Sequence, residues 1–398
     1  FYNDQDVFEL ELERIFRESW IFVGHESEIP DEGDYARRHI ANDTFIFVRD
    51  EDGGIKLLLD SCRHRGTQLC RADKGNTSHF RCPYHGWTYD NSGELVGVPY
   101  KHMGFEEMEK DDYALLEAPR VDTYAGLVFA SLAEEGQSLD EYLGGLKWYL
   151  DIVFKLPDGG MEVIGEPHRW VIESNWKVIS DNLVGQDSYH HESTHRSASE
   201  ALGGAETINE PGAAEERGGE QPHKHVRVSN GQIGVRGGLI EDRDVFFNYP
   251  EEVREFLTQE GLSETQYNLA RGSMGNAGSV FPNFIWIYLG DAVDSPNKDA
   301  GPYLTLRKFR PISPSQTEMV SWGLAPKQAP ESVKERMYEL YVANFGPSGN
   351  FEQDDATIWE GITAMSDSQL VKKQDLNGRY VMGMEGMEMD MDMGGMEM

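Results

Sequence analysis

Two short pairs of metal-binding residue types lie in the first quarter of the chain. Cys62 and His64 are separated by one residue, Cys82 and His85 by two, and seventeen residues lie between the pairs. Thiolates and imidazoles are the ligands of zinc and of iron–sulfur centres. Two such pairs on separate loops can converge and supply two sulfur and two nitrogen donors to one site.

Two kinds of centre use this donor set. A Rieske [2Fe–2S] cluster places two cysteines on one iron and two histidines on the other. A structural Cys2His2 zinc site pairs cysteine with cysteine and histidine with histidine, whereas each pair here is mixed, which favours the Rieske cluster. Gly66 and Gly86 follow the two pairs and suit loops that wrap closely around a cluster. The third cysteine, Cys70, is interpreted as a small buried apolar residue.

A second set of donors lies downstream. Residues 187–195 include Asp187, His190, His191 and His195, and residues 345–355 end in Asp354-Asp355. Non-heme Fe(II) oxygenases hold iron with two histidines and one carboxylate. Regular helix geometry favours His191 with His195, because residues four apart share a face. His190 and His195 are about 140° apart on a regular helix, so that pair requires a bulge or a helix end.

The motifs around these residues resemble those of a known family. Residues 62–66 (CRHRG) and 82–90 (CPYHGWTYD) closely resemble the Rieske motifs of aromatic-ring-hydroxylating dioxygenase large (alpha) subunits of the naphthalene and biphenyl dioxygenase type. Residues 189–195, with Tyr-His and then His after four residues, resemble the iron-binding motif of the naphthalene branch. Residues 351–355 (FEQDD) resemble the motif that carries the third iron ligand.

The resemblance implies a role for each of these residues. Cys62 and Cys82 would bind one cluster iron, and His64 and His85 the other. His190, His195 and Asp355 would bind a mononuclear Fe(II), with His191 as the alternative ligand. Asp187 would link the Rieske histidine His85 of one subunit to an iron-ligand histidine of its neighbour. Phe345 and Phe351, with His191, correspond to positions near the substrate pocket. Four residues separate Asn182 from Asp187 where the family has three, a difference that a π-bulge can absorb.

The function implied by the resemblance is that of a terminal oxygenase. It would hydroxylate an aromatic ring with O2, by cis-dihydroxylation, using electrons passed from NAD(P)H through a reductase or ferredoxin. The family forms homotrimers or α3β3 assemblies with a small β subunit. Alternatives are a Rieske monooxygenase or demethylase, an electron-transfer-only Rieske protein, and a zinc-binding interaction module. An acidic substrate would require a basic pocket residue, and the sequence does not place one.

The totals fit this interpretation. The 398 residues are enough for two or three domains. The net charge of −34 argues against nucleic-acid binding, which requires a basic face. No apolar run approaches the roughly 18–20 residues of a membrane span, and the chain starts without a secretory leader. We therefore expect a cytoplasmic protein. Three cysteines do not form a disulfide framework.

The elements predicted to position these residues indicate an α+β fold. We expect an N-terminal helix packing on the catalytic domain (1–33), an all-β Rieske domain (34–156), a catalytic domain of helices and antiparallel sheet (157–383) and a disordered acidic, Met-rich tail (384–398). Residues 44–48 and 55–59 predict a hairpin. Ser174 is expected to cap a helix running into the 180s, and residues 196–240 to form a long loop. Further strands are predicted at 281–289, 303–309 and 319–322, and a helix at 330–341.

Overall fold

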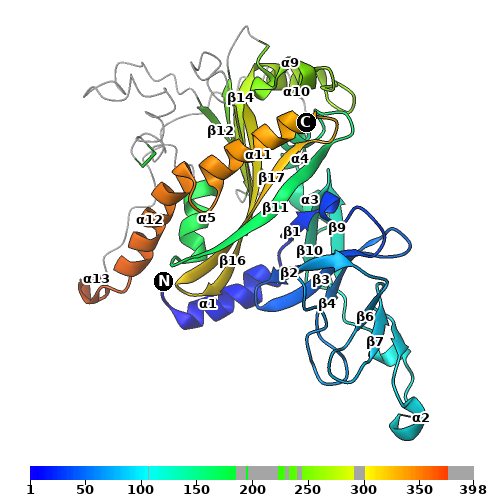
Figure 1. Cartoon of the computed structure of the whole chain (residues 1–398). Helices are drawn as coiled ribbons and strands as arrows, with labels where there is room; N and C mark the ends of the chain where they lie inside the picture. Colours follow the sequence, from blue (N-terminus) through cyan, green and yellow to red (C-terminus); the bar gives the residue numbers. More distant parts are fainter. Residues whose placement is uncertain are drawn as a thin grey trace.

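The structure, a computed structural model, describes residues 1–105, 107–184, 194–195, 223–228, 233–239, 244–290 and 301–374. It contains a small β module that includes strands β1 to β10 and a large module that includes elements α3 to α13 (Figure 1). The large module is built on one wide antiparallel sheet, and the small module projects from its lower side in this view. The predicted α+β class is confirmed.

The small module consists of three antiparallel sheets. Their strand orders are β1-β10-β9, β4-β3-β2-β5 and β6-β7-β8. The predicted hairpin is confirmed, as β3 (Asp43–Arg49) pairs with β4 (Ile55–Leu59) across a turn that contains Gly53 at φ +79°. The other strands are β1 (Ile21–His25), β2 (Asp34–Ile40), β5 (Lys74–Asn76), β6 (His79–Arg81), β7 (Thr88–Asp90), β8 (Leu95–Gly97), β9 (Arg120–Tyr124) and β10 (Leu127–Ser131). Helix α2 (Lys101–Gly104) lies at the outer tip of the module (Figure 1).

The large module contains a seven-stranded sheet in the order β11-β17-β16-β15-β14-β13-β12. The three strand segments predicted after residue 280 lie largely in neighbouring strands of this sheet, whose apolar side chains are mostly buried. The strands are β11 (Met161–Ile172), β12 (His223–Val228), β13 (Ile233–Leu239), β14 (Ser273–Val280), β15 (Phe284–Gly290), β16 (Pro302–Ser313) and β17 (Gln316–Pro326).

The prediction of a long loop over residues 196–240 is wrong in its second half. Strands β12 and β13 lie there, and β13 pairs with β14 from Ile233 to Leu239. The segment is rich in glycine and has little periodicity, so its own sequence carries a weak strand signal. Hydrogen bonding to β14, which is distant in sequence, stabilises the strand conformation that the local sequence favours only weakly.

Helices cover the large sheet. Helix α11 (Glu331–Phe345) includes all but the first residue of the predicted helix at 330–341. It runs across strands β11, β17 and β16, and is followed by α12 (Asn350–Met365) (Figure 1). Helix α5 (Trp176–Val184) lies against α12 and β14. The remaining helices are α1 (Gln5–Glu11), α3 (Leu139–Leu143), α4 (Leu146–Phe154), α9 (Glu251–Arg254), α10 (Glu264–Gly272) and α13 (Gln369–Gln374). A π-helical turn, Leu12–Phe16, extends α1.

The predicted cap of α5 is wrong by one residue. Asn175, not Ser174, accepts the backbone N–H of Lys177 in the first turn of the helix through its side-chain oxygen, at 3.0 Å. The Ser174 hydroxyl is fully buried and bonds to the Trp359 carbonyl and the Thr363 hydroxyl of α12. Serine and asparagine are both good helix caps. Because the Ser174 hydroxyl is engaged by α12, Asn175 caps the helix.

The hydrophobic core joins the two modules. One cluster contains Phe22 and Phe129 of the small module together with Trp286 and Trp322 of the large sheet. Helices α3 and α4 contribute Leu143 and several other residues to the same cluster, so residues 139–154 pack with the large sheet. The N-terminal helix also contacts the large module, through Glu11, which accepts from the Trp176 indole and pairs with Lys177. The domain boundaries at 33 and 156 stay predictions.

A row of hydrogen bonds connects the modules along strand β2 and Ala41, the residue that follows it. The pairing of β2 with β5 covers Asp34 to Ala36 and stops there. Beyond it, three cationic side chains of the large sheet donate to alternate carbonyls: Arg169 to Arg37 (3.5 Å), Lys308 to His39 (2.7 Å) and Arg310 to Ala41 (3.4 Å). Alternate residues of a strand face the same side. We call this row of three donors the cationic edge.

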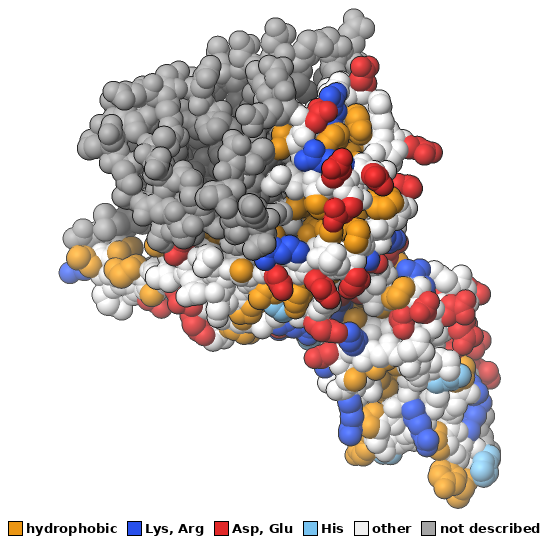
Figure 2. All heavy atoms as spheres, turned by 45° about the horizontal axis from the view of Figure 1, so that its top comes forward, with side chains coloured by type: hydrophobic (Ala, Val, Ile, Leu, Met, Phe, Trp, Pro, Cys, Tyr) orange, Lys and Arg blue, Asp and Glu red, His pale blue; other side chains and the backbone are white. Residues whose placement is uncertain are grey.

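The surface carries its charges unevenly. In Figure 2, acidic side chains gather along one flank, and lysine and arginine side chains lie toward the outer end of the small module. Large apolar side chains are exposed at that end, namely Tyr84, Tyr100 and Met103. Among the described helices, none combines the length and the apolar character needed to cross a membrane. The predicted disordered tail, 384–398, lies outside the described residues.

Candidate metal centres

The two loops that carry the first four candidate ligands have the same backbone design. In the loop after β4, the Cys62 carbonyl accepts the N–H of Gly66 at 2.8 Å, and in the loop between β6 and β7 the Cys82 carbonyl accepts the N–H of Gly86 at 3.0 Å. The two glycines have φ values of +73° and +72°. Glycine adopts this left-handed conformation without steric cost, which explains why it follows each Cys/His pair.

The loops bring the four side chains together at the outer end of the small module. The thiols of Cys62 and Cys82 are both buried in one hydrophobic cluster and lie close enough to interact with each other. The rings of His64 and His85 are edge to face, with centroids 4.6 Å apart. Two sulfur donors therefore lie inside the module and two nitrogen donors lie nearer its surface.

These side chains fit a Rieske cluster. The Nδ1 atom of His64 is buried and has no hydrogen-bond partner among the described residues, as expected for a nitrogen whose partner is a metal. The ring stacks on Trp87 at 4.9 Å, which fixes its plane. Burial lowers the pKa of His64, and the nearby charges of His85 and Arg65 lower it further. The imidazole is therefore neutral at pH 7, the form that binds iron.

Tyr89 supports the sulfur side of this centre. Its hydroxyl lies 3.4 Å from the Cys62 sulfur and accepts the backbone N–H of Arg63 at 3.0 Å. Burial raises the pKa of the Cys62 thiol, and the Tyr89 hydrogen bond acts in the opposite direction. Hydrogen bonds to ligand sulfurs tune the potential of iron–sulfur clusters. The sequence motif includes Tyr89 without indicating this contact, which depends on how β7 packs behind the first loop.

Cys70 has the environment expected for a small buried residue. It is 5% exposed, and burial raises the pKa of its thiol to about 12, so it stays protonated. Its backbone N–H donates to Asp60, which also accepts from Leu69. Cys70 thus belongs to the packing beneath the first loop.

The second candidate centre is formed where α12 meets residue 195. The Nε2 atom of His195 lies 3.3 Å from Oδ1 of Asp355, and its Nδ1 atom lies 3.4 Å from Oδ2 of Asp354. His195 and Asp355 are both 3% exposed. Burial alone would lower the pKa of His195, but the two carboxylates together raise it above its ordinary value. Two of the three predicted iron ligands, far apart in sequence, are therefore neighbours.

The remaining predicted residues of this centre, Asp187, His190 and His191, lie outside the described residues. Within the described ranges, no group of three or more histidine, cysteine or carboxylate side chains is placed to hold one metal ion. At the second centre, only two of the predicted iron ligands, His195 and Asp355, lie among the described residues, so a group of three is not expected there. For the first, a [2Fe–2S] cluster divides its four protein ligands between two irons.

Aromatic side chains border the second centre. The ring of Phe351 meets His195 edge to face at 5.0 Å and stacks on Phe345 at 5.3 Å. Phe345 is 5% exposed and ends helix α11, whereas Phe351 lies in the first turn of α12. The two rings predicted near the substrate pocket thus form one apolar wall beside His195.

A buried charged group behind Asp355 was not indicated by the sequence. Glu352 is 1% exposed and forms an ion pair with Arg307 of β16, which is itself fully buried. The Trp170 indole donates to the other carboxylate oxygen of Glu352 at 3.0 Å. Burial raises the pKa of Glu352, and Arg307 opposes this effect. Glu352 and Asp355 are three residues apart, which places both on one helix face. This spacing is the one feature of the sequence that could have indicated Glu352 as a neighbour of Asp355.

The two candidate centres lie far apart in space within one chain. Strands β6 and β7, which flank the second ligand loop, are at the lower right of Figure 1, and α12 lies across the molecule on the left. Electron transfer between two centres in one chain would have to cross this whole width.

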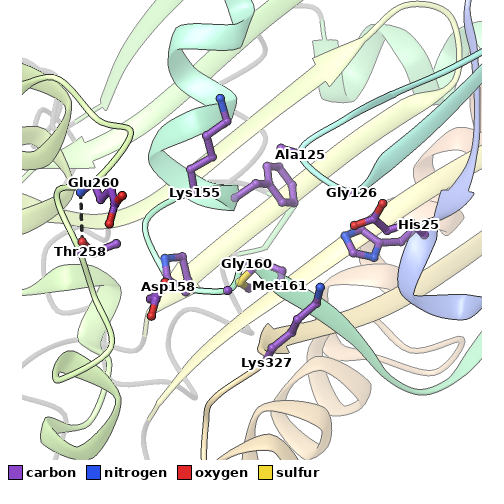
Figure 3. A pocket seen from close by; sticks show the side chains of 14 residues that line it. His25, Ala125, Gly126, Lys155, Asp158, Gly160, Met161, Thr258, Glu260 and Lys327 are labelled. Carbon is purple, nitrogen blue, oxygen red and sulfur yellow. Dashed lines mark hydrogen bonds between the residues drawn. The ribbon is translucent and has the colours of Figure 1, made fainter. Parts of the chain in front are cut away.

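A cavity of about 360 Å³ lies between the two modules, away from both centres. Figure 3 shows His25 and Gly126 of the small module on one side of the cavity and Lys155 and Asp158 of the large module on the other. None of the predicted site residues lines it. Burial lowers the pKa of His25 to about 4, so this ring is neutral. The cavity contains side chains of both charges, and it indicates no particular ligand.

Comparison with known proteins places this geometry in a family. Residues 19–119 match the Rieske [2Fe-2S] domain, and residues 139–388 match the catalytic domain of the ring hydroxylating alpha subunit. This chain is a ring-hydroxylating alpha subunit. The alpha subunit is therefore an oxidoreductase of the ring-hydroxylating dioxygenase family. Its Rieske domain implies a [2Fe–2S] cluster and its catalytic domain a mononuclear iron. It requires O2, an organic substrate and electron-transfer partners.

Three relatives illustrate how far the similarity extends. The alpha subunit is 34% identical to the N,N-dimethyl phenylurea N-demethylase subunit alpha of Sphingobium sp. (strain YBL2), over 95% of this chain and 82% of that protein. It is 33% identical to the benzene 1,2-dioxygenase subunit alpha of Pseudomonas putida, over 96% and 82%. A crystal structure of naphthalene 1,2-dioxygenase from Rhodococcus sp. bound to indole matches with a TM-score of 0.83 and 42% identity, covering 93% of this chain and 82% of that one.

Proposed function

We propose that the alpha subunit binds its Rieske cluster through Cys62, Cys82, His64 and His85, and its mononuclear Fe(II) through His190, His195 and Asp355. The orphaned Nδ1 atom of His64 supports the first assignment. The contact between His195 and Asp355 carries the second, because it joins two buried residues from distant parts of the sequence. His191 is the alternative to His190, since its spacing to His195 suits a regular helix.

The proposed reaction is the cis-dihydroxylation of an aromatic ring. The bound iron supplies the activation of O2, which the protein side chains do not provide. The chain's own contribution is to exclude water and to orient the ring. Phe345 and Phe351 suit a flat apolar substrate, because aromatic side chains pack edge to face or offset against another ring. The benzene and naphthalene dioxygenases among the relatives support an aromatic hydrocarbon as the substrate class.

The proposed electron path crosses a subunit boundary. In one chain the two centres are far apart (Figure 1), so we assign Asp187 to connect His85 of one subunit with an iron-ligand histidine of the next. A carboxylate between two ligand imidazoles accepts the free N–H of each and orients both rings. This arrangement requires a ring of subunits, either a homotrimer or an α3β3 assembly. A ferredoxin or reductase in the cytoplasm would supply the electrons.

N-demethylation is the second candidate function. It is supported by the N-demethylase subunit among the relatives, which is as similar in sequence as the benzene dioxygenase subunit. Product analysis separates the two reactions. A substrate such as naphthalene would yield a cis-dihydrodiol in the first case, and an N-methylated aryl urea would yield formaldehyde in the second.

The experiment that tests the metal assignments compares variants of the purified protein. Cys82→Ser is expected to lose the Rieske EPR signal, because one cluster ligand is removed. Asp355→Ala is expected to keep that signal but to lose the mononuclear iron and all oxygenation. Asp187→Asn is expected to keep both metals, and the reoxidation of its reduced cluster by substrate and O2 is expected to slow severely.

Other outcomes would contradict specific parts of the proposal. Stoichiometric zinc in a colourless protein would exclude the Rieske centre. If His191→Ala loses the mononuclear iron and His190→Ala keeps it, the iron ligand is His191 and not His190. An Asp187→Asn variant that turns over at the wild-type rate would remove Asp187 from the electron path.

A further inference from the structure

Arg307 is buried in the middle of the large sheet without access to solvent. Its side chain is 0% exposed, and its charge partner is Glu352, at 1% exposure. Among the described residues, its Nε and Nη1 atoms have no hydrogen-bond partner. A buried ion pair of this kind adds little stability compared with apolar residues of the same volume. General stabilisation of the core therefore does not explain it.

The contacts of Arg307 converge on the segment that presents Asp355. Glu352 lies in the first turn of α12, three residues before Asp355, and both side chains are buried. The guanidinium also lies 5.4 Å from the ring centroid of Phe345, the last residue of α11. Arg307 thus contacts both sides of the turn between the two helices. Since β16 is an inner strand of the sheet, this anchor is rigid.

Trp170 completes the anchor from a second strand. Its indole N–H donates to Glu352 at 3.0 Å, and the Arg307 guanidinium lies 5.8 Å from the centroid of its ring. The carboxylate of Glu352 is therefore held by a donor from β11 and a donor from β16. Each carboxylate oxygen accepts from one of these donors, so the first turn of α12 is tied to two strands of the sheet.

We propose that Arg307, Glu352 and Trp170 form a positioning triad that sets the orientation of the Asp355 carboxylate toward the mononuclear iron. This inference rests on the proposed role of Asp355 as an iron ligand. None of the triad's three residues is itself a proposed iron ligand. The triad acts through α12, in the way that residues behind a ligand orient it and strengthen metal binding.

The chain contains a second group of the same composition, which serves as a matched control. Arg38 pairs with Glu28 at 4% and 8% side-chain exposure, and the Trp322 indole donates to Glu28 at 2.8 Å. The Arg38 guanidinium lies 5.7 Å from the Trp322 ring centroid. This group joins β2 to the large sheet and contacts no candidate iron ligand. Any effect of simply unpairing a buried arginine must appear in both groups.

The experiment compares Glu352→Gln with Glu28→Gln in the full-length holoprotein. The Rieske EPR signal and the melting temperature are recorded, and Fe(II) affinity is measured by equilibrium dialysis after removal of the mononuclear iron. Both variants are expected to melt at lower temperature and to keep the cluster signal. Glu352→Gln is expected to bind Fe(II) about 10- to 100-fold more weakly, the range found for residues behind metal ligands. Glu28→Gln is expected to bind Fe(II) like the wild type.

A double variant separates positioning from stability. Arg307→Met combined with Glu352→Gln removes the unpaired buried charge, so the melting temperature is expected to recover. Fe(II) affinity is expected to stay low, because the two-sided hold on α12 is still missing. If affinity recovers together with the melting temperature, the triad is only a structural element. Should Glu352→Gln fail to fold, Trp170→Phe with Trp322→Phe as its control makes the same comparison with one hydrogen bond removed.

Failure of the triad and failure of the proposed iron site give different results. If Asp355→Ala retains mononuclear iron, the iron site itself is wrong. If Asp355→Ala loses iron while Glu352→Gln binds it like the wild type, the iron site stands and the positioning triad is refuted. Equal losses of Fe(II) affinity in Glu352→Gln and Glu28→Gln would also refute it.

Discussion

Replacing Lys308 by methionine tests the electrostatics of the module interface. Lys308 is 3% exposed and donates to the His39 carbonyl. Burial lowers its pKa to about 7, and the neighbouring charges of Arg38, Arg310 and Arg169 add to this effect against the opposing charge of Glu318. The ordinary pKa of a lysine side chain, which applies to an unfolded chain, is 10.5. Between these two values the unfolded chain therefore holds one proton more than the folded chain.

The sign of the effect follows from this difference. Where the unfolded state binds more protons, the free energy of unfolding rises with pH. One proton corresponds to about 1.4 kcal/mol per pH unit, so from pH 7.5 to 9.0 Lys308 alone contributes an increase of about 2 kcal/mol. Methionine has a similar volume and does not titrate. In Lys308→Met this increase is expected to be absent, while the contributions of all other groups remain.

The measurement is a series of urea unfolding curves, followed by tryptophan fluorescence at half-unit steps between pH 7.5 and 9.0. For each protein, the change in free energy of unfolding between pH 7.5 and 9.0 is determined. The value for the variant is then subtracted from the value for the wild type. The exposed residue Lys327 provides the control, as Lys327→Met is expected to follow the wild-type profile. Parallel profiles for the wild type and Lys308→Met would refute the reasoning, because Lys308 would then have the same pKa in both states.

Two further predictions concern the small module. Tyr89→Phe removes the hydroxyl 3.4 Å from the Cys62 sulfur, and a redox titration is expected to show a cluster potential lower by roughly 40 mV, the equivalent of about one hydrogen bond; an unchanged potential would mean that this contact is absent from the loaded protein. Gly126→Ala is expected to destabilise by about 2 kcal/mol or more, because Gly126 has φ +85° and an added Cβ would lie 2.3 Å from the buried His25 ring. Its control, Gly104→Ala, meets no heavy atom within 4 Å and is expected to melt like the wild type.

The parts of the fold that could be predicted are those with local causes. The hairpin at 44–59 has a short run of mostly apolar residues on each side of a glycine turn, and the predicted strands at 303–309 and 319–322 lie in β16 and β17. The first four candidate ligands are recognisable because a few residues on two short loops carry all the donors. Each of these features depends on residues close together in sequence.

Features that depend on distant contacts could not be predicted. Strands β12 and β13 exist because β14 offers hydrogen bonds to a glycine-rich segment. The pairing of Arg307 with Glu352 joins residues 45 apart, and neither has a local feature that indicates its partner. The choice between His190 and His191 also stays a prediction, because helix periodicity and the family motif favour different residues.

The cationic edge has a consequence for how the modules come apart. A strand whose backbone donors and acceptors are open is a template on which another chain can add a strand. Here Lys308 and Arg310 occupy the open carbonyls of His39 and Ala41 from within the same chain, and Arg169 shares the Arg37 carbonyl with Arg38. Separating the modules would uncover this edge together with the apolar contacts beside it. The small module, if produced alone, would therefore be prone to self-association through β2. In the intact chain, the large sheet covers this edge and prevents such pairing.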